Sequence, residues 1–188
     1  RLVGSEMCIR DSYMDKLARV PEAITRVLEN GETVRQFART MQDATSVIYL
    51  GRHVGFPVAL EGALKLKEIA YLHAEGFAAG ELKHGPIALV DKDMPIVFIA
   101  THHQLYHKII SNMVEVKSRD GRIMAVVTEG DEEIRKIADE VVEIPDVPEM
   151  LVPLLTVIPL QLLAYHVAVV KGLDVDMPRN LAKSVTVE

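Results

Sequence analysis

The sequence predicts an α/β protein, specifically a three-layer αβα sandwich built on a parallel sheet. Two observations support this prediction. Short apolar runs alternate along the chain with longer segments whose apolar residues recur at helical spacing. The short runs are almost continuously apolar, as expected for strands that helices cover on both faces. The strands are expected at residues 46–50, 94–100, 123–127 and 141–144.

The helices follow from the same periodicity and from residues that typically end helices. The first periodic segment stops at Asn30-Gly31, a pair that suits a left-handed helix end. Residues 151–170 have the length of a membrane span, but two prolines and two polar residues interrupt them, which favours a buried core helix. The expected helices cover residues 13–30, 32–42, 57–73, 104–118, 131–139 and most of 148–171.

Four parts are expected along the 188 residues, a length that suits one main domain. Residues 1–12 have no clear period and include Cys8, so we expect a non-native segment outside the fold. Residues 13–45 are expected to form leading helices, residues 46–176 the main α/β domain, and residues 177–188 a separate tail.

Composition excludes several function classes. The net charge is −6, there is no Trp, and aromatic residues make up 5%, so no nucleic-acid partner is expected. One cysteine and the lack of an evident signal peptide indicate a reducing, cytoplasmic location without membrane attachment. His103 and His107 have a zinc-compatible spacing but no obvious third ligand, so no metal is expected. No dinucleotide or phosphate-loop motif is present, and we expect no cofactor.

The segment from Leu60 to Pro86 concentrates the ionisable residues. In a helix over residues 57–73, Glu61, Lys65 and Glu68 share one face because they are spaced i, i+4 and i+7. Leucines around the remaining surface suggest that this helix is largely buried. Two interpretations remain open: a weak surface ion pair, or a proton-transfer site with shifted pKa values.

Two further residues extend this candidate site. His84 lies beside the turn residues Gly85-Pro86, where a histidine suits acid–base chemistry near neutral pH. Lys183 lies in the tail and is either a solvated lysine or an amine on a lid segment. Because residues 51–56 lead from the first strand into the charged helix, we expect the site beyond the carboxyl ends of the strands.

Two motifs carry a family resemblance that covers residues 13–188. The stretches ALEGALKLKEIAYLHAEGFAAGELKHGP and DMPRNLAKSVTVE closely resemble the C-terminal sugar isomerase (SIS) domain of the glutamine–fructose-6-phosphate aminotransferases, or glucosamine-6-phosphate synthases. The resemblance implies a flavodoxin-like or Rossmann-like SIS fold, with residues 46–176 as the second SIS domain and residues 177–188 as an active-site tail.

The resemblance also implies a reaction, the conversion of fructose 6-phosphate and ammonia into glucosamine 6-phosphate. The isomerase half opens the sugar ring, forms an imine and moves a proton between C1 and C2. A homodimer is implied, because the ring-opening histidine of this family reaches the neighbouring subunit. The implied roles are proton transfer for Glu68, ring opening for His84, carbonyl engagement for Lys183, substrate contacts for Lys65 and Ala182, and support for Glu61.

Departures from the family limit these expectations. The family enzyme has an N-terminal glutaminase domain and a first SIS domain that grips the substrate phosphate, and the sequence contains neither. We therefore expect a fragment with little turnover alone. Two alternatives remain: an amino-sugar-phosphate deaminase or deglycase on the same fold, which would release ammonia from glucosamine 6-phosphate, and a non-catalytic sugar-phosphate-binding module.

Overall fold

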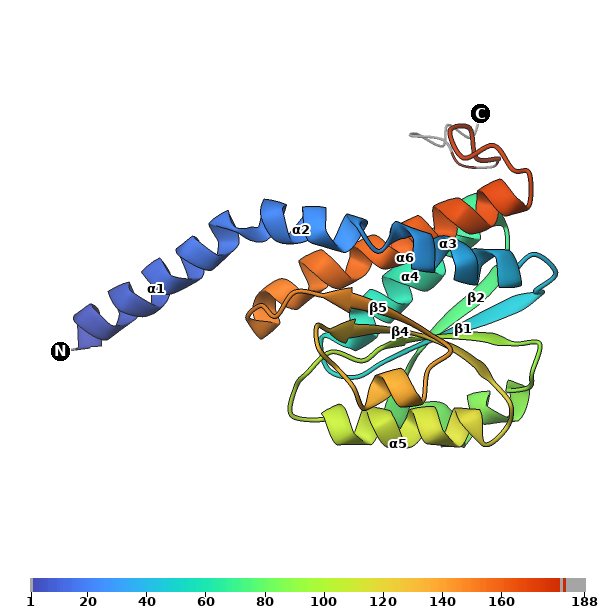
Figure 1. The fold of residues 1–188 in the computed structure, drawn as a ribbon, viewed down its shortest axis with the longest axis horizontal. Coiled ribbons are helices and arrows are strands. Elements are labelled where there is room, and N and C mark those ends of the chain that lie inside the picture. The colour runs from blue at the N-terminus through green and yellow to red at the C-terminus, as the bar shows by residue number, and fades with distance from the viewer. Residues whose placement is uncertain (1, 180, 182–188) are drawn as a thin grey trace, which may run out of the picture.

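The computed structural model describes residues 2–179 and residue 181, and it gives a five-stranded parallel sheet between layers of helices (Figure 1). The predicted three-layer α/β fold is confirmed. The strand order is β2-β1-β3-β4-β5, and every neighbouring pair is parallel. The strands are β1 (Ser46–Gly51), β2 (His73–Ala78), β3 (Pro95–Ile99), β4 (Arg122–Thr128) and β5 (Glu140–Ile144).

The helices form unequal layers on the two faces of the sheet (Figure 1). One face carries α2 (Val20–Leu28), α3 (Gly31–Thr40), α4 (Gly55–Ala70) and α6 (Val152–Val170). The other face carries α5 (Tyr106–Lys117) and the short 3₁₀ helix η1 (Ala79–His84). Further 3₁₀ turns are η2 (Pro86–Leu89), η3 (Ile134–Lys136) and η4 (Glu149–Leu151).

Two apolar cores lie on either side of the sheet, because successive strand residues point to opposite faces. Along β1, Val47 and Tyr49 face the four-helix layer, whereas Ile48 and Leu50 face α5. Within the described residues, Glu149–Val170 is the one helical stretch long and apolar enough to cross a membrane, and half of it is buried. It packs against α3 and α4 and closes the larger core, as expected for a core helix.

The prediction for residues 57–73 was wrong at its carboxyl end, where the structure has an additional strand. Helix α4 stops at Ala70 because Tyr71 adopts left-handed backbone angles (φ 52°, ψ 28°), and β2 begins at His73. Among the described residues, β2 pairs with β1 alone and is an edge strand of the sheet. Its Gly76 lies directly under α4: an added Cβ there would come within 2.9 Å of the Leu60 Cα. Close helix–strand packing explains this glycine, which weakens the strand signal in the sequence.

Two further helix predictions were wrong, those for residues 131–139 and for residues 13–30. Residues 131–139 form only the turn η3, because the Asp131 carboxylate accepts the backbone N–H groups of Glu133 and Ile134 and closes a local turn. The predicted helix over residues 13–30 is interrupted at Arg19, between α1 (Leu2–Ala18) and α2. Residues 2–12, which the sequence places outside the fold, belong to α1, a helix that projects away from the sheet (Figure 1).

Candidate functional site

Three charged side chains on α4 form a connected group, as their spacing predicts. The Lys65 Nζ lies 2.8 Å from Glu68 Oε2 and 3.4 Å from Glu61 Oε1. The side chains are partly exposed, 31% for Lys65, 29% for Glu68 and 40% for Glu61. Lys65 thus bridges two carboxylates that remain accessible to a molecule from outside.

The hydrogen bond to Glu68 raises the pKa of Lys65 above its ordinary value of 10.5. Partial burial works in the opposite direction, and the negative charges of Glu61 and Glu68 add to the increase. Lys65 is therefore a permanent positive charge at neutral pH. It holds the Glu68 carboxylate in one orientation through a charge-assisted hydrogen bond.

The expectation that α4 is largely buried was wrong for the face around this group. Leu60 and Leu64 are 45% and 42% exposed. Instead, small residues such as Ala59 and Ala63 face the sheet and α6 and allow a close approach. The charged group therefore lies at the boundary between the buried and exposed faces of the helix.

The position of Glu68 relative to the sheet also differs from the expectation. Helix α4 begins at Gly55, beyond the carboxyl end of β1, and runs back along the sheet. Glu68 lies in its last turn, about 20 Å along the helix axis from Gly55 at 1.5 Å per residue. The start of β2 at His73 is in register with the start of β1 at Ser46. Glu68 is therefore near the amino ends of these strands, not beyond their carboxyl ends.

An open cavity of about 380 Å³ adjoins the end of α4. Its wall contains Glu68 and two residues of the carboxyl-terminal segment, Arg179 and Leu181. Ala182 and Lys183, which the sequence assigns to the site, lie outside the described residues. The cavity lining comprises Lys67, Glu68, Tyr71, Leu72, His73, Arg179 and Leu181.

Tyr71 and Arg179 join the tail to the body of the protein, a contact that the sequence analysis missed. The backbone N–H of Arg179 donates a hydrogen bond of 2.7 Å to the Tyr71 hydroxyl. The Arg179 guanidinium lies over the Tyr71 ring, 4.3 Å from its centroid. The two residues are 108 positions apart, so no local pattern could reveal the contact. The one local feature that could have drawn attention to Arg179 is its place directly after Pro178.

His84 is not brought to the charged group within one copy of the chain. It is an exposed residue at the end of η1, followed by Gly85 with a φ of 155°. The buried residues of η1, Ala79 and Leu82, pack in the core on the α5 face of the sheet. Glu68 belongs to a helix on the other face. The sheet layer therefore separates the two elements.

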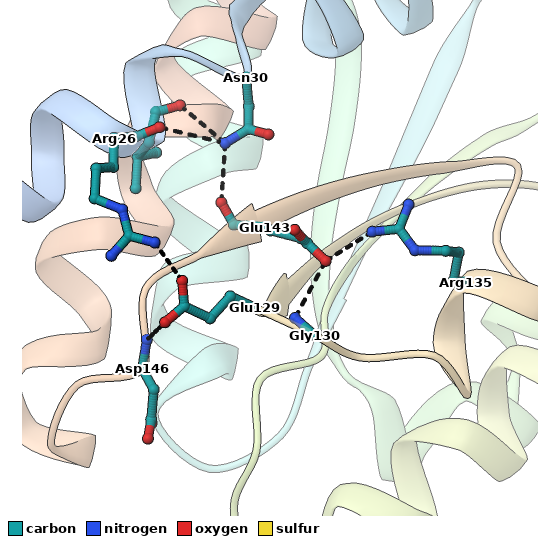
Figure 2. Close-up of polar contacts among 8 residues, drawn as sticks. Arg26, Asn30, Glu129, Gly130, Arg135, Glu143 and Asp146 are labelled. Carbon is teal, nitrogen blue, oxygen red and sulfur yellow. Dashed lines mark hydrogen bonds and ion pairs between the residues drawn. The ribbon is translucent and has the colours of Figure 1, made fainter.

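A second polar cluster lies beyond the carboxyl ends of β4 and β5 (Figure 2). Arg26 of α2 pairs with Glu129 at 2.5 Å, and Arg135 pairs with Glu143 at 2.7 Å. The Asn30 side-chain amide donates to the backbone carbonyl of Glu143 at 3.1 Å. The cavity between these residues measures about 180 Å³. The charged groups drawn in Figure 2 largely satisfy one another and anchor α2 to the sheet.

His53 and His103 lie in the loops after β1 and β3, at the edge of the sheet where the strands have their carboxyl ends. His53 Nδ1 lies 2.8 Å from Glu149 Oε1, and the His53 and His103 rings stack with centroids 6.1 Å apart. Burial, followed by the nearby His53, lowers the pKa of His103. His103 precedes α5 whereas His107 lies on it, so the two do not share one helix face. Within residues 2–179 and 181, no three His, Cys, Asp or Glu side chains are placed to hold a metal ion.

Comparison with protein families and curated proteins gives a consistent result. The family model described as "SIS domain" matches residues 40–171. The glutamine–fructose-6-phosphate aminotransferase [isomerizing] of Chlorobaculum tepidum is 56% identical over 173 residues, which is 92% of this chain and 28% of that protein. The chain thus spans less than a third of the length of this relative.

Solved structures show the same similarity. The C-terminal domain of glucosamine-fructose-6-phosphate aminotransferase from Francisella tularensis has a TM-score of 0.84 and 42% identity, covering 89% of this chain and 47% of that one. A glucosamine-6-phosphate deaminase from Thermotoga maritima has a TM-score of 0.61 and 21% identity, covering 85% of this chain and 48% of that one. The latter similarity establishes a shared fold and no more.

Proposed function

This chain belongs to the SIS domain family, and on that premise we propose that it provides isomerase residues of a glucosamine-6-phosphate synthase. The proposed reaction converts fructose 6-phosphate and ammonia into glucosamine 6-phosphate. One observation carries the proposal: Glu68 from α4 and Leu181 from the tail line the same cavity. An acid and the segment leading to an amine therefore meet at one place, as proton transfer next to an imine requires.

Glu68 is the proposed proton carrier. Once ammonia has formed an imine at C2, with the carbonyl oxygen lost as water, Glu68 removes a proton from C1 while the imine nitrogen gains one, which gives an enaminol. Glu68 then returns its proton to C2 as the C1 hydroxyl loses its own proton. This sequence leaves an aldehyde at C1 and an amine at C2. A proton carrier must keep a fixed distance from both carbons, and the 2.8 Å hydrogen bond from Lys65 supplies such a restraint. Lys65 also offers an ammonium to a sugar oxygen, while Glu61 restrains Lys65 from its other side.

Lys183 is the proposed amine that engages the sugar carbonyl. Its ε-amine would attack C2 and form a Schiff base as the carbonyl oxygen leaves as water; ammonia would then add to C2 and release the lysine amine, which leaves the imine of the preceding step. Leu181 contributes to the cavity wall, and two further residues extend at most about 7 Å along the chain. This reach supports an encounter between Lys183 and a sugar bound beside Glu68, with Ala182 as a backbone contact.

His84 is proposed to open the sugar ring in the active site of a second copy. The proposal rests on the separation of η1 and α4 by the sheet, because one copy cannot easily present both side chains to one sugar. An exchange of this kind requires a homodimer, most simply with two-fold symmetry. We also propose a cytoplasmic location, in line with the single cysteine of the chain.

The grip on the substrate phosphate is proposed to come from outside this chain. The turn between β1 and α4 offers little to a phosphate, because the N–H groups of Gly55 and Phe56 already donate to the carbonyls of Arg52 and His53. Glutamine hydrolysis is assigned to a separate glutaminase domain. The 188 residues alone should therefore show little turnover with fructose 6-phosphate and ammonium.

A chimeric enzyme tests the proposal. Residues 13–188 would replace the matching C-terminal part of the Chlorobaculum tepidum relative, and glucosamine 6-phosphate formation would be measured. In this chimera Glu68→Gln should reduce synthesis by about 10³-fold, within the range for loss of general acid–base catalysis, and leave glutaminase activity intact. The matched control Glu149→Gln removes a carboxylate at the opposite edge of the sheet and should leave synthesis unchanged.

The same assays contain the outcomes that contradict the proposal. Undiminished synthesis in Glu68→Gln would remove Glu68 from the reaction. Ammonia release from glucosamine 6-phosphate, without the reverse synthesis, would establish a deaminase instead. Tight sugar-phosphate binding by a chimera without turnover would identify a binding module.

A further inference from the structure

The last turn of α4 ends in a way that leaves an aromatic ring beside the tail. Tyr71 terminates the helix in the left-handed conformation, three residues after Glu68. Its side chain is partly buried and borders the cavity that Glu68 also lines. A tyrosine in this position can accept a hydrogen bond through its hydroxyl and a cation over its ring face.

Arg179 uses both properties of Tyr71. Its backbone N–H donates to the hydroxyl at 2.7 Å, and its guanidinium lies 4.3 Å from the ring centroid, well within the range of a cation–π contact. The two contacts act on different parts of the residue. The hydrogen bond fixes the path of the backbone, and the stacking fixes the direction in which the side chain leaves it.

The chain between α6 and Arg179 makes few contacts with the body of the protein. Leu173 and Val175 pack against the larger core. The Asp174 carboxylate, between them, accepts the N–H groups of Asp176 and Met177 and closes a local turn, and Met177 is 79% exposed. Among the described residues from 176 onwards, the hydrogen bond from Arg179 is the one that reaches the body of the protein.

We propose that Tyr71 and Arg179 form a clamp that positions the tail over the cavity beside Glu68. They are positioning residues, because neither is required to touch the reacting atoms. Lys183 is four positions after Arg179, a maximum reach of about 14 Å along the chain, so the clamp limits where the amine can go. The catalytic consequence rests on the proposed function, whereas the clamp itself does not.

Backbone dynamics of the 188-residue chain test the clamp directly. The ¹⁵N order parameter of the Leu181 amide should exceed about 0.6 in the unaltered chain and fall below about 0.6 in Tyr71→Ala and in Arg179→Ala. Tyr71→Phe keeps the ring and loses the acceptor, so its value should lie in between. Tyr165→Ala removes a 45%-exposed tyrosine on α6 and should change nothing at Leu181.

Thermal unfolding separates positioning from stability. Arg179→Ala alters a tail residue outside both cores and should leave the Tm unchanged while it loosens Leu181. An order parameter at Leu181 that stays the same in both Tyr71→Ala and Arg179→Ala would overturn the clamp, whatever the activity of Glu68→Gln.

Kinetics of the chimera test what the clamp does. Tyr71→Ala should lower kcat for sugar synthesis by about tenfold to a hundredfold, as expected when a reacting group is misplaced by ~1 Å, with a much smaller change in KM. Tyr71→Phe should recover part of the loss, and glutaminase activity should not change. A loosened tail with an unchanged kcat would contradict the positioning role. Retained synthesis in Glu68→Gln would instead contradict the proposed function and leave the clamp intact.

Discussion

The two edges of the sheet use their charged side chains in different ways. Beyond the carboxyl ends of the strands, Arg26 pairs with Glu129 and Arg135 with Glu143, beside a cavity of about 180 Å³ (Figure 2). His53 and Glu149 form a further pair at the same edge. At the opposite edge, Glu68 borders an open cavity of about 380 Å³ that the tail also lines. Ligands of parallel α/β folds usually bind at the first edge. The acids are paired at both edges, since Glu68 also has Lys65 as its partner, and what distinguishes the edge with Glu68 is that a distant segment of the chain reaches its cavity.

The largest stability effect that bears on this comparison concerns the packing of α4 on β2. Gly76→Ala should destabilise the protein by about 1–3 kcal/mol, because the added Cβ meets backbone atoms of Leu60 and Ala59, which cannot move as a side chain would. Urea unfolding measures the change. Gly31→Ala, in α3, is the matched control: nothing lies within 4 Å of its added Cβ, so it should be neutral or slightly stabilising. Equal effects of the two substitutions would contradict the close packing seen here.

A smaller effect on stability should appear at acidic pH and concerns His103, beyond the carboxyl end of β3. The pKa of His103 is lowered by burial first and then by His53 and Arg52, against the opposing charge of Glu149. The unfolded chain therefore takes up this proton first, and stability is lost as the pH falls below about 6.5. Unfolding free energies between about pH 7.5 and 5.5 should fall less steeply in His103→Gln than in the unaltered chain. An equal slope in His103→Gln and in the unaltered chain would contradict the link between this histidine and stability.

The smallest effect on stability should appear at alkaline pH and concerns the pair of Lys65 and Glu68, near the amino ends of β1 and β2. The pKa of Lys65 is raised, chiefly by its hydrogen bond to Glu68, so its contribution is present below pH 10.5 and lost as the pH rises through the folded value. Lys65→Met should cost at most about 0.5 kcal/mol at pH 9, typical of one exposed helical ion pair, and less at higher pH. A difference that grows with pH would contradict the pairing. Salt at about 1 M should reduce the difference at either pH.

Most of the sheet could be predicted from sequence because four strands are nearly continuous apolar runs. Strand β2 could not, since its residues other than Phe77 are small or polar and, within the part of the chain that the structure describes, it pairs with β1 alone. Gly76 lowers the strand propensity of this segment, and its structural reason, the close approach of α4, is visible in the tertiary structure alone. The left-handed Tyr71 likewise ends α4 where the periodicity predicts that the helix continues.

The candidate site was predictable in part. The i, i+4 and i+7 spacing placed Glu61, Lys65 and Glu68 together, because helical geometry is local. The location of Glu68 was not predictable from that spacing, since it depends on where along the sheet the helix turn falls. The contact between Tyr71 and Arg179 depends on tertiary packing alone. Local sequence therefore identifies a charged group, and the fold decides what reaches it.

The six-residue length of β2 has one more consequence. This strand and Leu72 form the covalent link between Tyr71, at the cavity, and the η1 turn that ends in His84. Deleting one residue from the strand would shorten this link by about 3.3 Å and also turn every later side chain of the strand to the opposite face. Loops elsewhere on the molecule can change length, but an insertion or deletion in β2 would shift the η1 turn with His84 relative to Tyr71 and the cavity.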